Sequence, residues 1–267
     1  MRNTPNEKNM NTTRRYRTTT FAIFCFCLLF SACAANNENL KKKAEASRTL
    51  GEAYMIQKNY AFALKSLLES QKLDPEEPMV YYDLGLVYMA KERLDTAIEN
   101  FQKAIQIKPN FAPAINALGN AYLRQKKWDT AIVQFDKLTD DLLYATPHYP
   151  FYGLGIAYFH KKEFGKAKSN FEEAIKLQPK FFEAFWWLGK THLETGHIAE
   201  SRDALNEAIE LSPGFTPAYM ILAQNFLLTG EVEEAEQAYR KVMEIAPGSP
   251  DAKQAEKELK QMKSSNL

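Results

Sequence analysis

The side chains that could carry catalysis or bind a metal are few and scattered in this sequence. Its histidines, His148, His160, His192 and His197, stand singly, and none has a ligand partner at an obvious spacing. There is no phosphate-binding loop, no dinucleotide-binding glycine pattern and no nucleophile elbow. We therefore predict that the protein is not an enzyme and has no catalytic residue, metal, cofactor or small-molecule substrate.

Cys33 is the residue whose surroundings indicate covalent chemistry. Three arginines within residues 14–17 precede an apolar run at 21–30, which is too short to span a membrane and is typical of a secretory signal. The small residues Ser31 and Ala32 before this cysteine resemble the cleavage box of bacterial lipoproteins. The resemblance implies a signal peptide over residues 1–32, cleavage before Cys33, and lipidation of Cys33 as a membrane anchor.

Other interpretations of the amino terminus stay open. Phe30 stands where the lipoprotein box usually has an aliphatic residue, so the segment can also be an ordinary signal peptide with a chance cysteine, or an uncleaved anchor. The chain can start at Met1 or Met10. Ala34 follows the cysteine where an aspartate would favour the inner membrane, so the resemblance implies the periplasmic face of the outer membrane. Residues 33–43 are polar and are expected to form a flexible lipidated tether.

The rest of the sequence is built on a repeat of about 34 residues. Glycine recurs at positions 51, 85, 119, 155 and 189, and Ala223 follows at the same interval. In the unit at 78–111, apolar residues follow helical spacing in two stretches, which the segment 91–95 separates and Pro109 ends. Each unit is therefore predicted to be a pair of amphipathic helices joined by a turn.

This pattern resembles the tetratricopeptide repeat. The fourth unit shows it best, with Phe151, Leu154, Gly155, Tyr158, Ala167, Phe171, Ala174 and Pro179 at the motif positions. The resemblance implies an all-α fold, a right-handed α-solenoid of about six helix–turn–helix repeats. The repeats are placed at 44–77, 78–111, 112–147, 148–181, 182–215 and 216–249. Residues 250–267 are expected to form a capping helix and tail.

The first helix of each repeat is expected to line a concave inner wall, which in this family binds peptides or helices of partner proteins. Aromatic residues, methionine and amides fill its wall positions here, and such side chains are common in protein interfaces. The alternative is that several of them pack between helices instead. The predicted partner-binding residues are Met79, Tyr82, Leu86, Met89, Asn116, Asn120, Tyr149, Tyr152, Ile156, Phe159, Trp186 and Met220.

The third repeat departs from the pattern. The spacing of the glycines grows to 36 residues there, and the segment from Thr139 to Gly153 has no proline at the usual place. This segment is either a tolerated insertion or a binding feature, because Tyr144, His148, Tyr149 and Tyr152 gather in it.

The break, a Leu-Tyr-x-Thr-Pro motif at Leu143 to Pro147 and the lipoprotein box together resemble the lipoproteins of type IV pilus biogenesis. Those proteins serve as pilotins for the outer-membrane secretin, so the resemblance implies a secretin subunit as partner. The alternative is a general envelope scaffold for cell-wall enzymes or outer-membrane assembly factors. Removing residues 1–32 changes the net charge from +1 to −3, with 29 basic and 32 acidic residues, and nothing in this balance favours nucleic acid.

Overall fold

The computed structural model describes residues 37–140 and 144–265, and every regular element in these ranges is helical. The all-α prediction is confirmed. The chain divides into two compact units at Lys91, and each is described by itself. No helix within the described ranges is both long and apolar enough to cross a membrane. Cys33 and the signal peptide lie outside the described residues.

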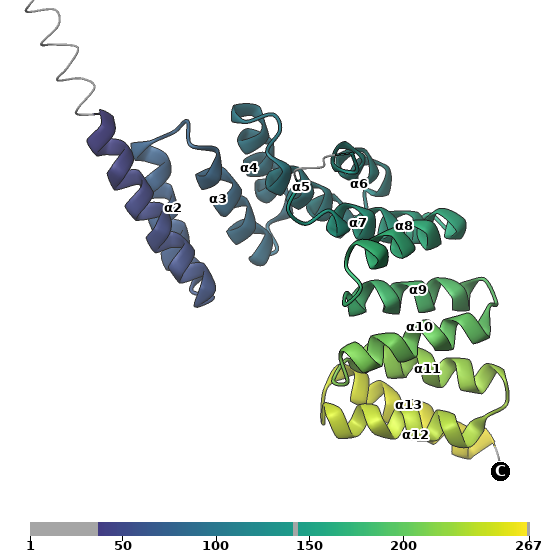
Figure 1. Cartoon of the computed structure of the whole chain (residues 1–267). Helices are drawn as coiled ribbons and strands as arrows, with labels where there is room; N and C mark the ends of the chain where they lie inside the picture. The colour runs from purple at the N-terminus through teal and green to yellow at the C-terminus, as the bar shows by residue number, and fades with distance from the viewer. Residues whose placement is uncertain (1–36, 141–143, 266–267) are drawn as a thin grey trace, which may run out of the picture. The chain divides into compact units, whose positions relative to one another are not determined.

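The first unit consists of a helix over residues 37–56, α2 (Tyr60–Leu73) and α3 (Pro78–Ala90). The first two helices are joined by a buried hydrogen bond of 2.7 Å, which the Ser70 hydroxyl donates to the carbonyl oxygen of Ala44. Ala63 and Leu67 of α2 are fully buried and form the centre of this packing. Helix α3 packs against α2 (Figure 1).

The start of the first helix corrects one prediction. Residues 37–43 are helical, so the expected flexible tether over 33–43 is wrong for this part. The segment is polar, but Leu40 is half-buried and Ala44 is buried, and their spacing of four residues places them on the same side of a helix. This short apolar contact extends the helix seven residues before the expected start of the first repeat at 44.

The second unit is an array of helices in which each packs against the next (Figure 1). The first helices of the repeats begin at residues 112, 148, 182 and 216, which are the expected repeat starts. The elements are α4 (Leu94–Ile107), α5 (Ala112–Arg124), α6 (Trp128–Phe135), the 3-10 helix η1 (Asp136–Leu138), α7 (His148–His160), α8 (Phe164–Leu177), α9 (Phe182–Glu194), α10 (Ile198–Leu211), α11 (Thr216–Leu228), α12 (Val232–Ile245) and α13 (Pro250–Ser265).

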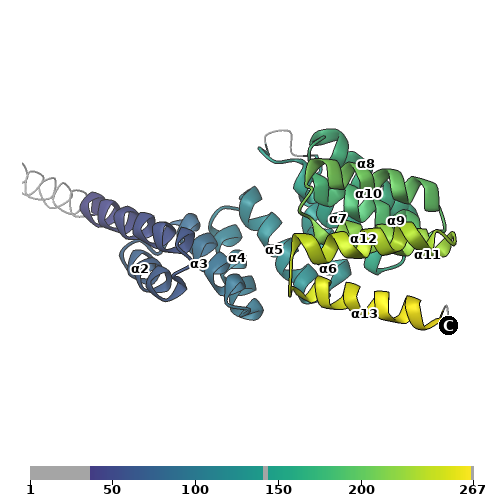
Figure 2. The ribbon, with the colours of Figure 1, turned by 90° about the horizontal axis from the view of Figure 1, so that it is seen from below.

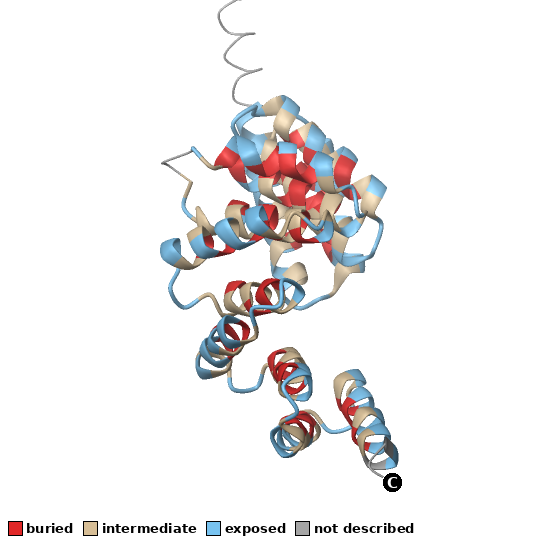
Figure 3. Cartoon of the chain, turned by 90° about the vertical axis from the view of Figure 1, so that its right-hand side faces the viewer, coloured by how far each residue is buried: buried red, intermediate tan, exposed pale blue. Residues whose placement is uncertain are grey.

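The motif glycines allow a large side chain of the second helix to pack directly on the backbone of the first. A Cβ atom built on Gly119 would lie 2.6 Å from the Phe135 ring, and one on Gly155 would lie 2.4 Å from the Phe171 ring. Both rings are fully buried. Figure 3 shows such buried residues on the sides of helices that face other helices, with exposed residues on the opposite sides.

The turn between the two helices of a hairpin has the same backbone conformation along the chain. One residue in each turn has a positive φ, from 56° to 80°, at positions 58, 92, 126, 162, 196 and 230. The intervals between them repeat the spacing of the motif glycines. Only the last two of these residues are glycines, Gly196 and Gly230, so the other turns hold a lysine or a glutamate in the left-handed region.

The irregular third repeat has a shortened second helix. Helix α6 has 8 residues, whereas α4, α8, α10 and α12 have 14. The 3-10 helix η1 follows α6 directly, and α7 then begins at His148. Tyr144 packs with Ile115 and Leu138 in a small core cluster, so this tyrosine supports the fold of the insertion.

The carboxyl end of the array is covered by α13, as the sequence predicts. Ala252, Ala255 and Leu259 are buried on α13, and the last two belong to a core cluster with Tyr239 and Val242 of α12. The two helices lie side by side in Figure 2.

Candidate functional site

The predicted wall positions of three consecutive repeats meet on the first helices of the second unit. Helix α9 contacts both α7 and α11, so side chains at equivalent positions share one side of the three helices. We call this surface the inner aromatic face. It consists of Tyr149, Tyr152 and Ile156 of α7, Trp186 and Lys190 of α9, and Met220 of α11.

Two tyrosines of α7 differ in their access to solvent. Tyr149 is 42% exposed and lies edge-on against Phe181, with ring centroids 5.7 Å apart. Tyr152 packs more deeply, 4.8 Å from Phe181 and 6.2 Å from Phe171. Burial raises the pKa of Tyr152 to about 12, and the nearby Trp187 indole opposes this rise. Tyr149 is therefore available to a partner, whereas Tyr152 mainly supports the face from below.

Trp186 connects α9 to the next repeat. Its indole N–H donates a hydrogen bond of 3.3 Å to the carbonyl oxygen of Pro217, and its ring lies 5.6 Å from Phe215. Ile156 and Met220 are half-buried and pack against neighbouring core clusters. These contacts fix the orientation of the face before any partner arrives, which lowers the entropic cost of binding.

Lys190 was not predicted from the sequence, although it occupies the position in α9 that Ile156 occupies in α7. Its Nζ lies 4.9 Å from the Trp187 ring, 5.1 Å from Phe159 and 5.7 Å from Trp186. Aromatic rings at these distances attract an ammonium group. The face therefore contains a positive charge that the rings hold in place.

Phe159 does not form part of the exposed surface. It is only 8% exposed and packs edge-on against Phe164 and Trp187, at 5.5 and 5.1 Å. The prediction that it lines the wall is wrong because the next helix of the array covers this position. The aromatic neighbours of Phe159 make it part of the core under Lys190.

The two predicted amides of α5 differ in their hydrogen bonding. The Asn120 side chain donates a hydrogen bond of 3.1 Å to the backbone oxygen of Asn116. The Asn116 Oδ1 atom is buried and has no hydrogen-bond partner within the described residues.

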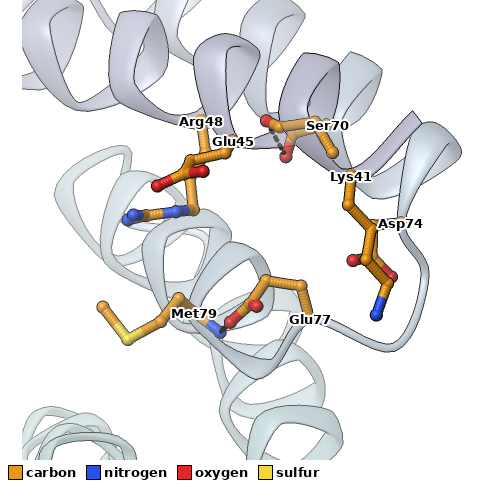
Figure 4. Close-up of a pocket in the computed structure, with 8 residues that line it drawn as sticks. Lys41, Glu45, Arg48, Ser70, Asp74, Glu77 and Met79 are labelled. Carbon is orange, nitrogen blue, oxygen red and sulfur yellow. Dashed lines mark hydrogen bonds between the residues drawn. The ribbon is translucent and has the colours of Figure 1, made fainter. Parts of the chain in front are cut away.

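The four wall residues predicted in α3 belong to the first unit. Met79, Tyr82, Leu86 and Met89 are all half-buried. Met79 also borders a pocket of about 360 Å³, which Figure 4 shows. The helix over 37–56 contributes Lys41, Ala44, Glu45 and Arg48 to this pocket, and Ser70, Asp74, Glu77 and Met79 complete it. The lining carries both charge signs, so the pocket can hold polar groups of a bound chain.

The pocket was not predicted, because its walls come from residues that the repeat motif does not specify. Glu77 caps α3 by accepting a hydrogen bond of 3.0 Å from the Met79 amide, which places this carboxylate at the pocket edge. Nearby, Arg48 Nη1 lies 3.3 Å from Oδ2 of the buried Asp83 and also pairs with Glu52. Burial and the charge of Glu52 raise the pKa of Asp83 to about 6, despite the opposing effect of Arg48.

The histidines have packing roles. His160 stacks on Trp128 with ring centroids 4.4 Å apart, and His148 contacts Tyr149 and Phe181. Burial lowers the pKa of His148, His160 and His192, which favours their neutral forms. Within the described ranges, no three side chains of histidine, cysteine, aspartate or glutamate are arranged to hold a metal.

Comparison with protein families shows repeats of one kind along the chain. A model described as TPR repeat matches residues 85–126, and a model described as tetratricopeptide repeat matches residues 152–214 and 191–250. Comparison with curated protein sequences gave no match.

Solved structures share the fold. The structure of pilF from Pseudomonas aeruginosa has a TM-score of 0.71 and 18% identity, over 82% of this chain and 99% of that chain. PilW, described as a widely conserved type IV pilus biogenesis factor, has a TM-score of 0.74 and 22% identity, over 79% and 97%. A MamA structure has a TM-score of 0.54 and 26% identity, over 64% and 92%.

Proposed function

Because the chain belongs to the tetratricopeptide repeat family, we propose that it is a non-catalytic adaptor that holds a segment of an outer-membrane secretin subunit during type IV pilus biogenesis. Repeats of this family form scaffolds for protein–protein interaction. In this proposal the protein is a pilotin, which keeps the secretin subunit at the membrane where the subunits assemble.

The observation that carries the proposal is the inner aromatic face. This face brings together the Tyr149 ring, which is 42% exposed, the half-buried Met220 and the Lys190 ammonium group, which lies over three rings. Aromatic and methionine side chains fit the apolar side of a peptide or helix, and exposed apolar surface of this kind marks an interaction site. Lys190 adds a place for an acidic or carbonyl group of the bound segment.

The pilus role is supported by the extent of the structural similarity. The similarity covers 99% of the pilF chain and 97% of the PilW chain, so the shared fold extends over nearly the whole of those two proteins. The lipid anchor rests on the sequence around Cys33. In the proposed mechanism, acylation at the periplasmic face of the outer membrane raises the local concentration of the captured subunit.

Deletion of the gene tests the proposal. We expect the deletion strain to lose multimeric secretin and surface pili, and the wild-type gene to restore both. A Tyr149→Ala, Met220→Ala variant should restore them poorly. A control variant with Val133→Ala and Leu177→Ala, which changes exposed apolar residues outside the face, should restore them fully. Normal secretin multimers in the deletion strain would reject the pilus role and favour a general envelope scaffold.

A further inference from the structure

The first hairpin, formed by the helix over 37–56 and α2, carries an unusual amount of exposed apolar surface. Among the described residues, nine large hydrophobic side chains are exposed, and four of them lie between residues 50 and 68. The exposed fractions are 49% for Leu50, 85% for Ile56, 52% for Phe62 and 45% for Leu68. Ile56 is the most exposed of all nine.

Leu50 and Ile56 form a surface together with smaller exposed residues of the first helix. Six exposed positions share one side of this helix, and they are Lys42, Ala46, Thr49, Leu50, Ala53 and Ile56. Helix α2 joins this surface through Phe62, whose ring lies 5.3 Å from the Tyr54 ring. We call this set of residues the amino-terminal face.

The two ends of the chain differ in how their apolar residues are covered. At the carboxyl end, α13 packs over α12 and buries Ala255 and Leu259. At the amino end, Leu50 occupies a position of the repeat motif whose equivalents Leu84, Leu118 and Leu154 are all at most 4% exposed. An end repeat without a polar outer face needs a cover in order to remain soluble.

The charge of the first hairpin indicates what covers its exposed apolar surface. Residues 37–73 hold seven basic and four acidic residues, a net charge of +3, whereas residues 74–267 hold 22 basic and 28 acidic residues, a net charge of −6. Lys41, Lys42 and Lys43 are all exposed in the first two turns of the helix. Basic residues beside an exposed apolar stripe are typical of helices that lie on anionic lipid.

The position of the helix over 37–56 in the chain also favours contact with lipid. Because the helix extends to residue 37, only residues 34–36 separate it from Cys33. The Cα atoms of residues 33 and 37 are then at most about 14 Å apart, even in a fully extended chain. An acyl chain on Cys33 would therefore hold this helix within reach of the lipid headgroups.

We propose that the amino-terminal face lies on the surface of an anionic lipid bilayer, with Leu50, Ile56 and Phe62 in the headgroup region and with Lys42 and Lys43 near lipid phosphates. The inference deepens the proposed function, since it rests on the lipid anchor of that proposal. Surface contact holds the first hairpin in a fixed orientation at the membrane, which a flexible tether would not do.

Vesicle binding of a chain without acylation tests this proposal. The mature chain from residue 33 with Cys33→Ser is mixed with vesicles of phosphatidylethanolamine and phosphatidylglycerol, and the bound fraction is measured by co-sedimentation. We expect binding that weakens when salt is added or when phosphatidylcholine alone is used. Replacing Leu50, Ile56 and Phe62 by glutamine should weaken binding by about tenfold or more. Lys42→Glu with Lys43→Glu should weaken binding to anionic vesicles only.

The matched control changes exposed apolar residues elsewhere. Val133→Gln, Leu177→Gln and Leu228→Gln should leave vesicle binding unchanged, and circular dichroism establishes that each variant is folded. Absent binding, or equal losses in the test and control variants, would overturn the proposal. A dimer that forms through Leu50, Ile56 and Phe62 would overturn it too, since a second copy would then be the cover. None of these results depends on the pilus role, which secretin assembly in the deletion strain tests separately.

Discussion

Replacing Gly155 by alanine should destabilise the protein, although alanine is the better helix former. Gly155 lies inside α7, where the new Cβ atom would be 2.4 Å from Cε1 and 2.6 Å from Cδ1 of Phe171. Ordinary contacts with a Cβ atom are 3.4–4 Å long, so the Phe171 ring would have to move by about 1 Å. This ring is fully buried and stacks 6.0 Å from Trp187, so its movement would also disturb the inner aromatic face.

Two opposing contributions set the size of the effect. Overpacking of a filled core costs about 1–3 kcal/mol, whereas the change from glycine to alanine inside a helix gains at most about 1 kcal/mol. With the full gain, the net loss is about 0–2 kcal/mol in the free energy of unfolding, and relative to a glycine-to-alanine change without overpacking the loss is about 1–3 kcal/mol. Gly165 in α8 provides the matched control, because nothing lies within 4 Å of its Cβ position. Gly165→Ala should raise the free energy of unfolding by up to about 1 kcal/mol.

Urea denaturation followed by circular dichroism measures both variants. A second test uses Phe171→Leu, which removes part of the obstructing ring. In the Gly155→Ala background this substitution should cost less than in the parent protein, because the smaller side chain relieves the overlap. If Gly155→Ala were as stable as Gly165→Ala, or if the two substitutions at 155 and 171 were additive, the close approach of α7 and α8 would not be the reason for this glycine.

Three further predictions concern the backbone, a buried charge and a polar contact. Gly196 and Lys162 both have a positive φ, which favours glycine. Gly196→Ala should therefore lower the free energy of unfolding by about 1 kcal/mol, and Lys162→Gly should raise it. A higher melting temperature for Gly196→Ala than for Lys162→Gly would contradict this. The raised pKa of Asp83 means that the folded state favours its protonated form. The free energy of unfolding, measured by urea titration, should therefore fall by about 3 kcal/mol as the pH rises from 4 to 6. Asp83→Asn should remove this fall. The Ser201 hydroxyl donates a hydrogen bond of 2.7 Å to the Gly189 backbone oxygen and accepts one of 2.9 Å from the Asn225 side chain. Ser201→Ala should therefore lower the free energy of unfolding by about 1–3 kcal/mol, and by less in an Asn225→Leu background. Equal losses in both backgrounds would contradict this coupling.

The helices could be predicted because the repeat motif specifies contacts that recur at a fixed interval. Four motif glycines, Gly51, Gly119, Gly155 and Gly189, lie opposite a large residue of the second helix of their hairpin, and this pairing determines how closely the two helices approach. Residues 37–43 carry no such motif, and their polar composition indicated a tether. These residues are nevertheless helical, with Leu40 half-buried on the side of Ala44 and Lys42 paired with Glu38 one turn away.

The site could be predicted only in part. The register of the repeat places Tyr149, Trp186 and Met220 on one side of α7, α9 and α11, but it does not determine how far each side chain is covered. Phe159 is buried because Trp187 packs over it, and this contact depends on the next repeat. Lys190 joins the face through Trp186 and Trp187 of its own helix and through Phe159 of the preceding repeat, and the motif specifies none of these contacts.

Direct binding between the purified mature protein and its secretin subunit tests the central claim, that the inner aromatic face holds this partner. The dissociation constant is measured by titration for the parent, for Tyr149→Ala with Met220→Ala, and for Val133→Ala with Leu177→Ala. The account predicts that the first pair weakens binding by about tenfold or more, while the second pair leaves it unchanged. Equal affinity of all three proteins would contradict the claim.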